Sequence, residues 1–287
     1  MSELVNGKVW ADYRDNILID HDNPILAFKA NRDRYTEAKS QSDYAGLAQI
    51  GSVHSEDALT WNVFRTLAVF NQLKVLEPLL GKLDDPQVLL WTLSFSPETD
   101  KLQYVVGETI RSIDGKHMGQ ITEPDVIIKT KDKVFVIECK LGEVDKATHL
   151  WQSHQSSKPL SEQGPQKRQK DYFVDNENPF KKDASLDLYS TDAYQLYRMA
   201  FYAYQLGKKL KTAACCVSLT NENWWKQGAN SAETIFAKFH KEVDAKKLAL
   251  KSIFWQDIAK QVNSQDDYRL GMLKEYLKKH PCLQSKE

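Results

Sequence analysis

The sequence predicts an α/β or α+β sandwich with a mixed central sheet, from the kinds of segment it contains and from their order. Apolar runs typical of strands occupy 88–93, 102–106, 126–128, 134–139 and 212–219. Helical patterns occupy 55–76, 193–206 and most of 232–280. The order of helix, strands mostly in hairpins, long polar loop, helix, strand and helices predicts helices packed against one sheet.

The composition fits a soluble globular protein, because 41% of the 287 residues are hydrophobic and 27% are charged. No apolar run reaches the roughly 18 residues needed to cross a membrane. The segment Met1–Lys8 has no apolar signal-peptide region after a basic start. We therefore expect a cytoplasmic protein that makes no contact with membranes.

The cysteines and the charge balance limit the possible functions. Four cysteines without a CxxC spacing predict reduced core thiols rather than a zinc site. The 39 basic residues balance 39 acidic ones, which excludes a generally basic coat for nucleic acid but leaves room for a local basic face. Candidate phosphate contacts are Lys167, Arg168, Lys170, Lys208, Lys209 and Lys211. A solvated face is the alternative interpretation.

The helix predicted from Ser55 has a clear start and end. Ser55 is an N-cap candidate, and Glu56 and Asp57 place negative charge in the first turn, where the helix dipole favours it. Pro78 and Gly81 end the segment.

No internal repeat and no Gly/Ser linker divides the chain, so a single domain over 1–287 is the simplest organisation. Its core would span about 55–220. An N-terminal extension at 1–54 and a helical region at 221–287 would elaborate that core.

The most informative segment is a predicted hairpin that begins at Pro124-Asp125 and ends at Glu138-Cys139-Lys140. If Lys131 and Asp132 form a two-residue turn, Asp125 lies directly opposite Glu138, with Cβ atoms about 5 Å apart. Strand alternation places Lys140 on the same face as Glu138. Two carboxylates at this separation can bind Mg²⁺, and a lysine beside them can stabilise charge on a phosphate. Emergence of the strand into solvent would also explain charges at this position.

This hairpin resembles the active site of the PD-(D/E)xK nuclease superfamily. Pro124-Asp125 matches the PD element, and Glu138-Cys139-Lys140 matches the (D/E)xK element. The resemblance covers about residues 55–220 and implies a restriction-endonuclease-like α/β/α core. In that superfamily a helix before the sheet often adds an acid, for which Glu56 is the best match and Asp57 the second. A later helix adds a polar residue, which Gln195 matches.

The resemblance implies a Mg²⁺-dependent nuclease, with Mn²⁺ as a substitute, that hydrolyses DNA in preference to RNA by metal-activated water. Asp125, Glu138, Glu56 and the Cys139 carbonyl would bind the metal, Lys140 would assist the attacking water, and Gln195 would position water or phosphate. Some exonuclease-like members carry a tyrosine four residues after the glutamine, and here that position is Met199, which departs from that subgroup's pattern. We expect an endonuclease rather than an exonuclease. A cutter of both strands would often need two active sites, which suggests a homodimer.

Two other interpretations remain open. The fold could be a catalytically inactive module that binds nucleic acid or a protein. The chain could also be an unrelated enzyme whose hairpin acids are surface charges. The sequence determines neither the cleavage specificity nor the biological pathway.

Overall fold

The computed structural model describes residues 2–35, 44–114, 123–141, 177–182, 184, 193–225 and 231–284. The chain divides into two units, Met1–Leu83 with Trp255–Glu287, and Asp84–Phe254. The whole central sheet belongs to the second unit. No described helix has the length and apolar character that crossing a membrane requires.

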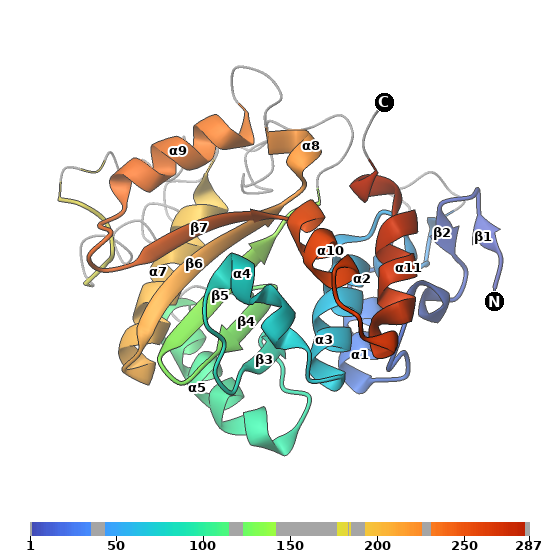
Figure 1. Ribbon diagram of the computed structural model, residues 1–287, viewed down its shortest axis with the longest axis horizontal. Coiled ribbons are helices and arrows are strands. Elements are labelled where there is room, and N and C mark those ends of the chain that lie inside the picture. The colour runs from blue at the N-terminus through green and yellow to red at the C-terminus, as the bar shows by residue number, and fades with distance from the viewer. Residues whose placement is uncertain are drawn as a thin grey trace. The chain divides into compact units, whose positions relative to one another are not determined.

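A five-stranded mixed sheet forms the centre of the second unit (Figure 1). In order across the sheet, its strands are β3 (Gln87–Leu90), β4 (Val126–Lys129), β5 (Lys133–Cys139), β6 (Ala213–Thr220) and β7 (Ala249–Phe254). The β3–β4 and β4–β5 pairs are antiparallel, whereas β5–β6 and β6–β7 are parallel. The predicted mixed sheet is therefore confirmed.

The hairpin register is the predicted one. Val126 pairs with Ile137, and Lys129 pairs with Val134. Thr130 N donates to Lys133 O at 2.8 Å, which closes the loop over Lys131 and Asp132. The same register extended by one position places Asp125 opposite Glu138.

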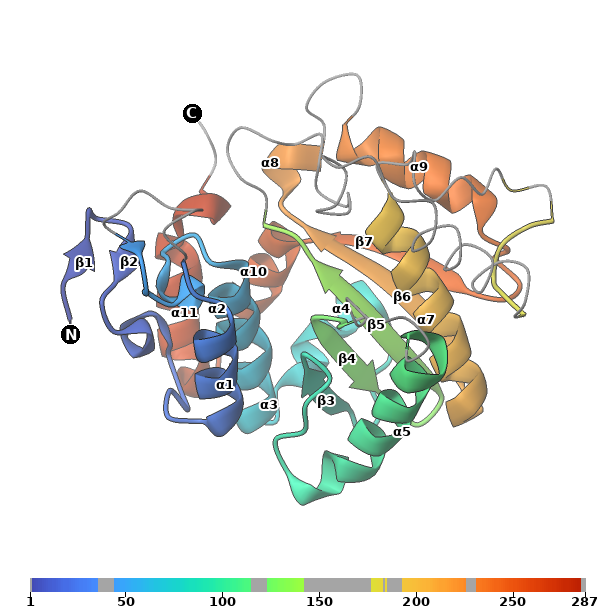
Figure 2. The ribbon, with the colours of Figure 1, turned by 180° about the vertical axis from the view of Figure 1, so that it is seen from behind.

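Two long helices, α5 (Pro97–Asp114) and α7 (Tyr194–Leu210), cover one face of this sheet (Figure 2). Val134 and Val136 of β5 point to this face and join the apolar core that both helices share. Phe135 and Ile137, on the opposite face, are also buried. Burial of both faces explains why β5 is almost continuously apolar.

Helix α7 connects the parallel strands β5 and β6 and packs tightly on β6. A Cβ atom at Gly207 would lie 2.7 Å from Ala214 Cβ, so only glycine allows this approach. Because Gly207 lies beside the start of β6, the last turns of α7 lie at that end of the sheet. With 17 residues, α7 extends about 25 Å. Its first turn therefore lies at the carboxyl ends of β5 and β6.

The strand predicted at 102–106 was wrong, because these residues lie within α5. The β-branched pair Val105-Val106 suggested a strand. The buried positions Leu102, Val106, Thr109, Ile110 and Ile113 instead follow helical spacing. Strand β3 also ends earlier than predicted, since Trp91 and Thr92 have positive φ values of 49° and 67°.

The region 221–287 was predicted to be mostly helical, and it contains α8 (Glu222–Trp225), α9 (Ala232–Glu242), α10 (Trp255–Asn263) and α11 (Gly271–Lys279). It also contains β7, which the prediction missed. Ala249, Leu250 and Lys251 have good helix propensity, but pairing with β6 overrides this local preference.

The first unit begins with the strands β1 (Leu4–Val5) and β2 (Val9–Trp10) and the helix α1 (Pro24–Arg32). It contains Ser55, whose hydroxyl accepts the Ala58 N–H as the predicted N-cap. Single 3-10 turns occupy Tyr13–Asn16, Gln49–Gly51, Leu73–Leu76, Tyr268–Leu270 and Pro281–Leu283.

The predicted helix 55–76 is divided. It consists of α2 (Glu56–Thr60), a π-helical turn (Trp61–Arg65) and α3 (Thr66–Val69). The chain then turns at Asn71, which has a φ of 54°, and α4 (Glu77–Leu80) follows the 3-10 turn. The segment ends at Gly81, as predicted, with a φ of 93° that favours glycine.

Candidate active site at the carboxyl end of strand β5

Two main-chain N–H groups, one in β5 and one directly after β3, hold Asp125 at the start of the hairpin. Its Oδ2 accepts a 2.7 Å hydrogen bond from Cys139 N, and its carbonyl accepts one of 3.0 Å from Trp91 N. The antiparallel register directs Asp125 and Glu138 to the same face of the sheet. The carboxylate of Asp125, directly before β4, therefore lies opposite the carboxylate of Glu138 in β5.

Glu138 and Lys140 form an ion pair on this face, as strand alternation predicted. Lys140 Nζ lies 2.9 Å from Glu138 Oε1, and the side chains of Glu138 and Lys140 are only 7% and 17% exposed. A buried carboxylate is costly unless a positive charge or a hydrogen bond compensates it. The Lys140 main chain is fixed as well, because its N–H donates to Leu219 O at 2.8 Å.

Hydroxyl groups on the neighbouring parallel strands continue this polar row. Glu138 pairs with Ser218, which pairs in turn with Ser252. Thr220 lies two residues after Ser218 and shares its face. The Oγ atoms of Ser218 and Ser252 and the Oγ1 of Thr220 are buried and have no hydrogen-bond partner among the residues described. The sequence prediction missed these residues, although polar side chains at the end of the predicted strand 212–219 were a usable signal.

Gln195 lies in the first turn of α7, which the helix geometry places at the carboxyl ends of β5 and β6. Its Oε1 is buried and finds no hydrogen-bond partner within the described part of the chain. A buried polar atom without a partner costs free energy and often marks a functional position. The structure thus brings Gln195 to the same end of the sheet as Asp125, Glu138, Cys139 and Lys140.

A buried ion pair joins the two helices near this end. Arg198 NH2 lies 3.1 Å from Asp114 Oδ2, and Asp114 is the last residue of α5. Burial, with the Asp114 charge nearby, raises the pKa of Tyr202 well above its usual range, so this phenol stays neutral. The sequence prediction missed Asp114 because it did not recognise α5 as a helix.

The further acids expected from the resemblance lie in the other unit. Glu56 is the first residue of α2, and Asp57 Oδ1 lies 3.3 Å from Lys29 Nζ. The role of Glu56 in the metal shell stays a prediction. Of the predicted basic contacts, Lys167, Arg168 and Lys170 lie outside the described residues.

The cysteines are confirmed as free thiols, and three of the four are buried. Burial raises the pKa of Cys215 to about 11 and that of Cys216 well above its usual range, so neither forms a reactive thiolate near neutral pH. The side chain of Cys139 is completely buried on the face opposite Glu138, which leaves its main chain as its contribution to the site.

The donors at this end of the sheet suit a hard divalent ion. Within the described ranges, no three His, Cys, Asp or Glu side chains come close enough to form a metal cluster. Mg²⁺ does not require such a cluster, because it usually keeps several waters and takes one or two carboxylates plus substrate phosphates. The opposed carboxylates of Asp125 and Glu138 fit that requirement.

The five-stranded mixed sheet with its flanking helices has the architecture of a restriction-endonuclease-like core. Residues 7–280 match the family described as Restriction Endonuclease associating with ARP, and the chain belongs to this family. No curated protein and no solved structure matches the chain.

Proposed function

We propose that this protein is a Mg²⁺-dependent nuclease of the PD-(D/E)xK type that hydrolyses phosphodiester bonds in DNA. The observation that carries the proposal is the hairpin register, which places Asp125 opposite Glu138, together with the ion pair of Glu138 and Lys140. Membership of a restriction-endonuclease family supports it independently. Endonucleolytic cleavage and work in the cytoplasm are parts of the same proposal.

The carboxylates of Asp125 and Glu138 and the carbonyl of Cys139 would hold the metal, with Glu56 as the further acid. When bound, Mg²⁺ supplies a Lewis acid that polarises the phosphate and makes water more acidic. The hydrogen bond from Cys139 N orients the Asp125 carboxylate, so that the protein reorganises little when substrate binds.

Lys140 and Gln195 would act on the phosphate and the attacking water. The Lys140 ammonium, held 2.9 Å from Glu138, places a positive charge where negative charge grows on the scissile phosphate. The Gln195 Oε1 can accept a hydrogen bond from the attacking water and hold it in line. Neither residue needs to change its charge near neutral pH to fill these roles.

The partners follow from the substrate and from the family description. Cleavage of both strands often uses two active sites, and a homodimer that supplies them is part of the proposal. The family description names an association with ARP, and we extend that association to this chain as part of the proposal.

Plasmid cleavage tests the proposal directly. Purified protein should convert supercoiled DNA to nicked or linear forms with Mg²⁺ and not with EDTA. Asp125→Ala and Lys140→Ala should each slow this conversion by about a hundredfold or more, with both variants still folded by circular dichroism. Unchanged cleavage in both variants would overturn the assignment.

An inactive module is the second candidate. The observation that favours it is that the described residues bring two acids, not three, to the hairpin. Such a module would bind DNA or ARP with no cleavage at any Mg²⁺ or Mn²⁺ concentration. Its binding would not change when Asp125 is replaced.

A further inference from the structure

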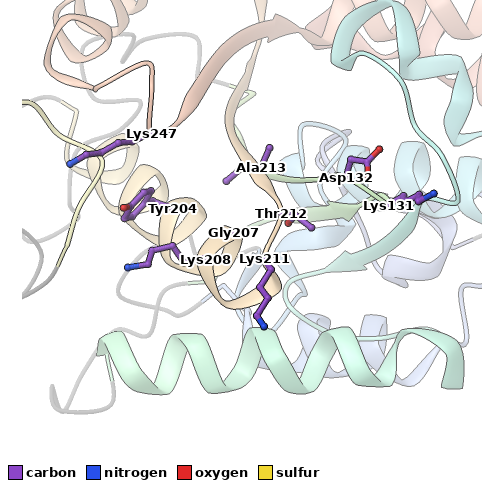
Figure 3. A pocket seen from close by; sticks show the side chains of 10 residues that line it. Lys131, Asp132, Tyr204, Gly207, Lys208, Lys211, Thr212, Ala213 and Lys247 are labelled. Atoms are coloured by element: carbon purple, nitrogen blue, oxygen red, sulfur yellow. The ribbon is translucent and has the colours of Figure 1, made fainter.

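A second polar site lies at the opposite end of the same sheet. It is a pocket of about 380 Å³ whose lining includes the β4–β5 turn, the end of α7 and the start of β6. Figure 3 shows the side chains that line it, among them four lysines, Lys131, Lys208, Lys211 and Lys247. These lysines come from separate parts of the sequence, and only folding brings them to one pocket.

The charge of this pocket is positive despite the neutral chain. Asp132 is the one acidic residue among the described lining residues, against four lysines. The end of α7 adds a partial negative charge of about half a unit, which the lysines also outweigh. The pocket therefore attracts anions.

Two of the lysines are available for an anion. Lys131 and Lys211 are exposed and form no ion pair with any residue in the described part of the chain. Lys208 pairs with Glu177, and Lys247 Nζ donates to Asn178 O at 3.0 Å. Exposed ion pairs contribute little net stability, because water screens both charges, so Lys208 can exchange Glu177 for a phosphate at little cost.

A neutral donor completes the lining. The Oγ1 of Thr212 is buried and has no hydrogen-bond partner among the described residues. Hydroxyl groups and lysines together are typical of sites that contact the sugar-phosphate backbone of nucleic acids.

The directions of the side chains favour an extended ligand. In Figure 3, Lys208 and Lys247 point to one side of the pocket, Lys131 points to the other, and Lys211 points away from both. A single phosphate cannot contact four ammonium groups that diverge in this way. A chain of phosphates can, because each lysine then meets a different group.

The position of the pocket relates it to the candidate active site. Strand β5 has seven residues and separates the turn at Lys131-Asp132 from Glu138 and Lys140. Its length is about 20 Å, which equals about six base-pair steps of a duplex. The pocket cannot therefore hold the phosphate that is cleaved at Asp125 and Glu138, but it can hold the backbone of the same duplex further along.

We propose that the pocket formed by Lys131, Lys208, Lys211 and Lys247 is a second binding site for the phosphate backbone of duplex DNA. The inference rests on the proposed function in one respect, since it takes DNA as the substrate. The inference adds a second contact with the DNA backbone, about six base pairs from the bond that is cleaved. Long substrates then gain affinity from contacts that take no part in the chemistry.

Salt-dependent DNA binding tests this proposal. The double variant Lys131→Gln/Lys211→Gln removes two charges from the pocket, and Lys101→Gln/Lys238→Gln removes two exposed charges elsewhere in the same unit. Fluorescence anisotropy would follow a labelled duplex of about 30 base pairs, longer than the two sites require, in EDTA and at several salt concentrations. Thermal unfolding checks that both variants remain folded.

The pocket variant should bind this duplex about tenfold more weakly near 0.1 M salt, and its salt slope should fall by about 2. The control variant should keep the native slope. Equal slopes in the native protein and the pocket variant would overturn the proposal and leave the lysines to an acidic protein partner. Inorganic phosphate binding that is lost in the pocket variant, with DNA binding intact, would also overturn it and indicate a site for small anions.

The two proposals fail separately. Absence of Mg²⁺-dependent plasmid cleavage, with weakened duplex binding in the pocket variant, refutes the nuclease and supports the pocket. Cleavage that depends on Asp125, with unchanged duplex binding in the pocket variant, supports the nuclease and refutes the pocket.

Discussion

The two ends of the central sheet differ in how they carry charge. At the carboxyl end of β5, the buried Glu138 pairs with the largely buried Lys140, with Oε1 and Nζ 2.9 Å apart. At the opposite end, Lys131 and Lys211 are exposed and without an ion pair among the described residues. One strand of seven residues connects these two environments.

This difference separates two tasks. Buried charges with fixed partners can stabilise a transition state, because the surrounding protein does not reorganise during the reaction. Exposed lysines cannot do this, since water screens them, but they attract a polyanion over some distance. We therefore assign catalysis to the carboxyl end of β5 and additional binding of the DNA backbone to the lysine pocket at the opposite end.

The largest effect on cleavage is expected when the Asp125 carboxylate is replaced by a carboxamide. Asp125→Asn should slow plasmid cleavage about a thousandfold, because it removes a charge that the reaction requires and keeps the size of the side chain. The measurement is the initial rate of nicking at saturating Mg²⁺. Asp85→Asn is the matched control, since Asp85 is exposed and its φ of 46° suits asparagine. An equal loss of cleavage rate in both variants would refute a specific role of Asp125 in cleavage.

A smaller effect is expected at Lys140. Lys140→Met should reduce the cleavage rate about a hundredfold, because the ammonium no longer faces the phosphate. The same variant leaves Glu138 buried without its ion-pair partner, so its melting temperature should also fall. Lys101→Met, on the exposed side of α5, should change neither quantity. Native cleavage by Lys140→Met would remove this lysine from the mechanism.

The packing of α7 on β6, which fixes α7 along the sheet, can be tested at Gly207. Gly207→Ala should lower the free energy of unfolding by about 1–3 kcal/mol, because the new Cβ would lie 2.7 Å from Ala214 Cβ. Gly107→Ala is the control, since its nearest neighbours are side-chain atoms of Arg111 at 3.6 Å. This control should be neutral or stabilising by about 0.5–1 kcal/mol in urea unfolding. Equal stability of the two variants would contradict the close contact of α7 and β6.

The smallest effect is expected from the buried hydroxyl at Ser218. Ser218→Ala should change the free energy of unfolding by less than about 0.5 kcal/mol, because no described hydrogen bond is lost. It should slow cleavage less than about tenfold, in contrast to the neighbouring acids. A large loss of stability would show that this hydroxyl has a structural partner.

Local patterns were sufficient to predict the hairpin. The two polar residues Lys131 and Asp132 between apolar runs fixed the turn, and the turn fixed the register of Asp125 and Glu138. The start of α2 at Ser55 was predictable for the same reason, because a cap depends on residues close in sequence.

Features that depend on tertiary packing were not predictable. Val105 and Val106 suggested a strand, but burial against the sheet selects the helix α5. Pairing with β6 made a strand of 249–254, where local propensity favoured a helix. The sequence analysis named two lysines of the pocket, Lys208 and Lys211, as candidate phosphate contacts. It did not connect them with Lys131 and Lys247, because only the tertiary fold brings these distant residues together.

Calorimetric titration with Mn²⁺ tests the central claim, a metal site at Asp125 and Glu138, most directly. It measures metal binding at this site without requiring a substrate. The native protein should bind the ion, Glu138→Gln should lose this binding, and Glu233→Gln, at an exposed position of α9, should retain it. Equal Mn²⁺ binding by all three proteins, or none by the native protein, would contradict a metal-dependent site at Asp125 and Glu138.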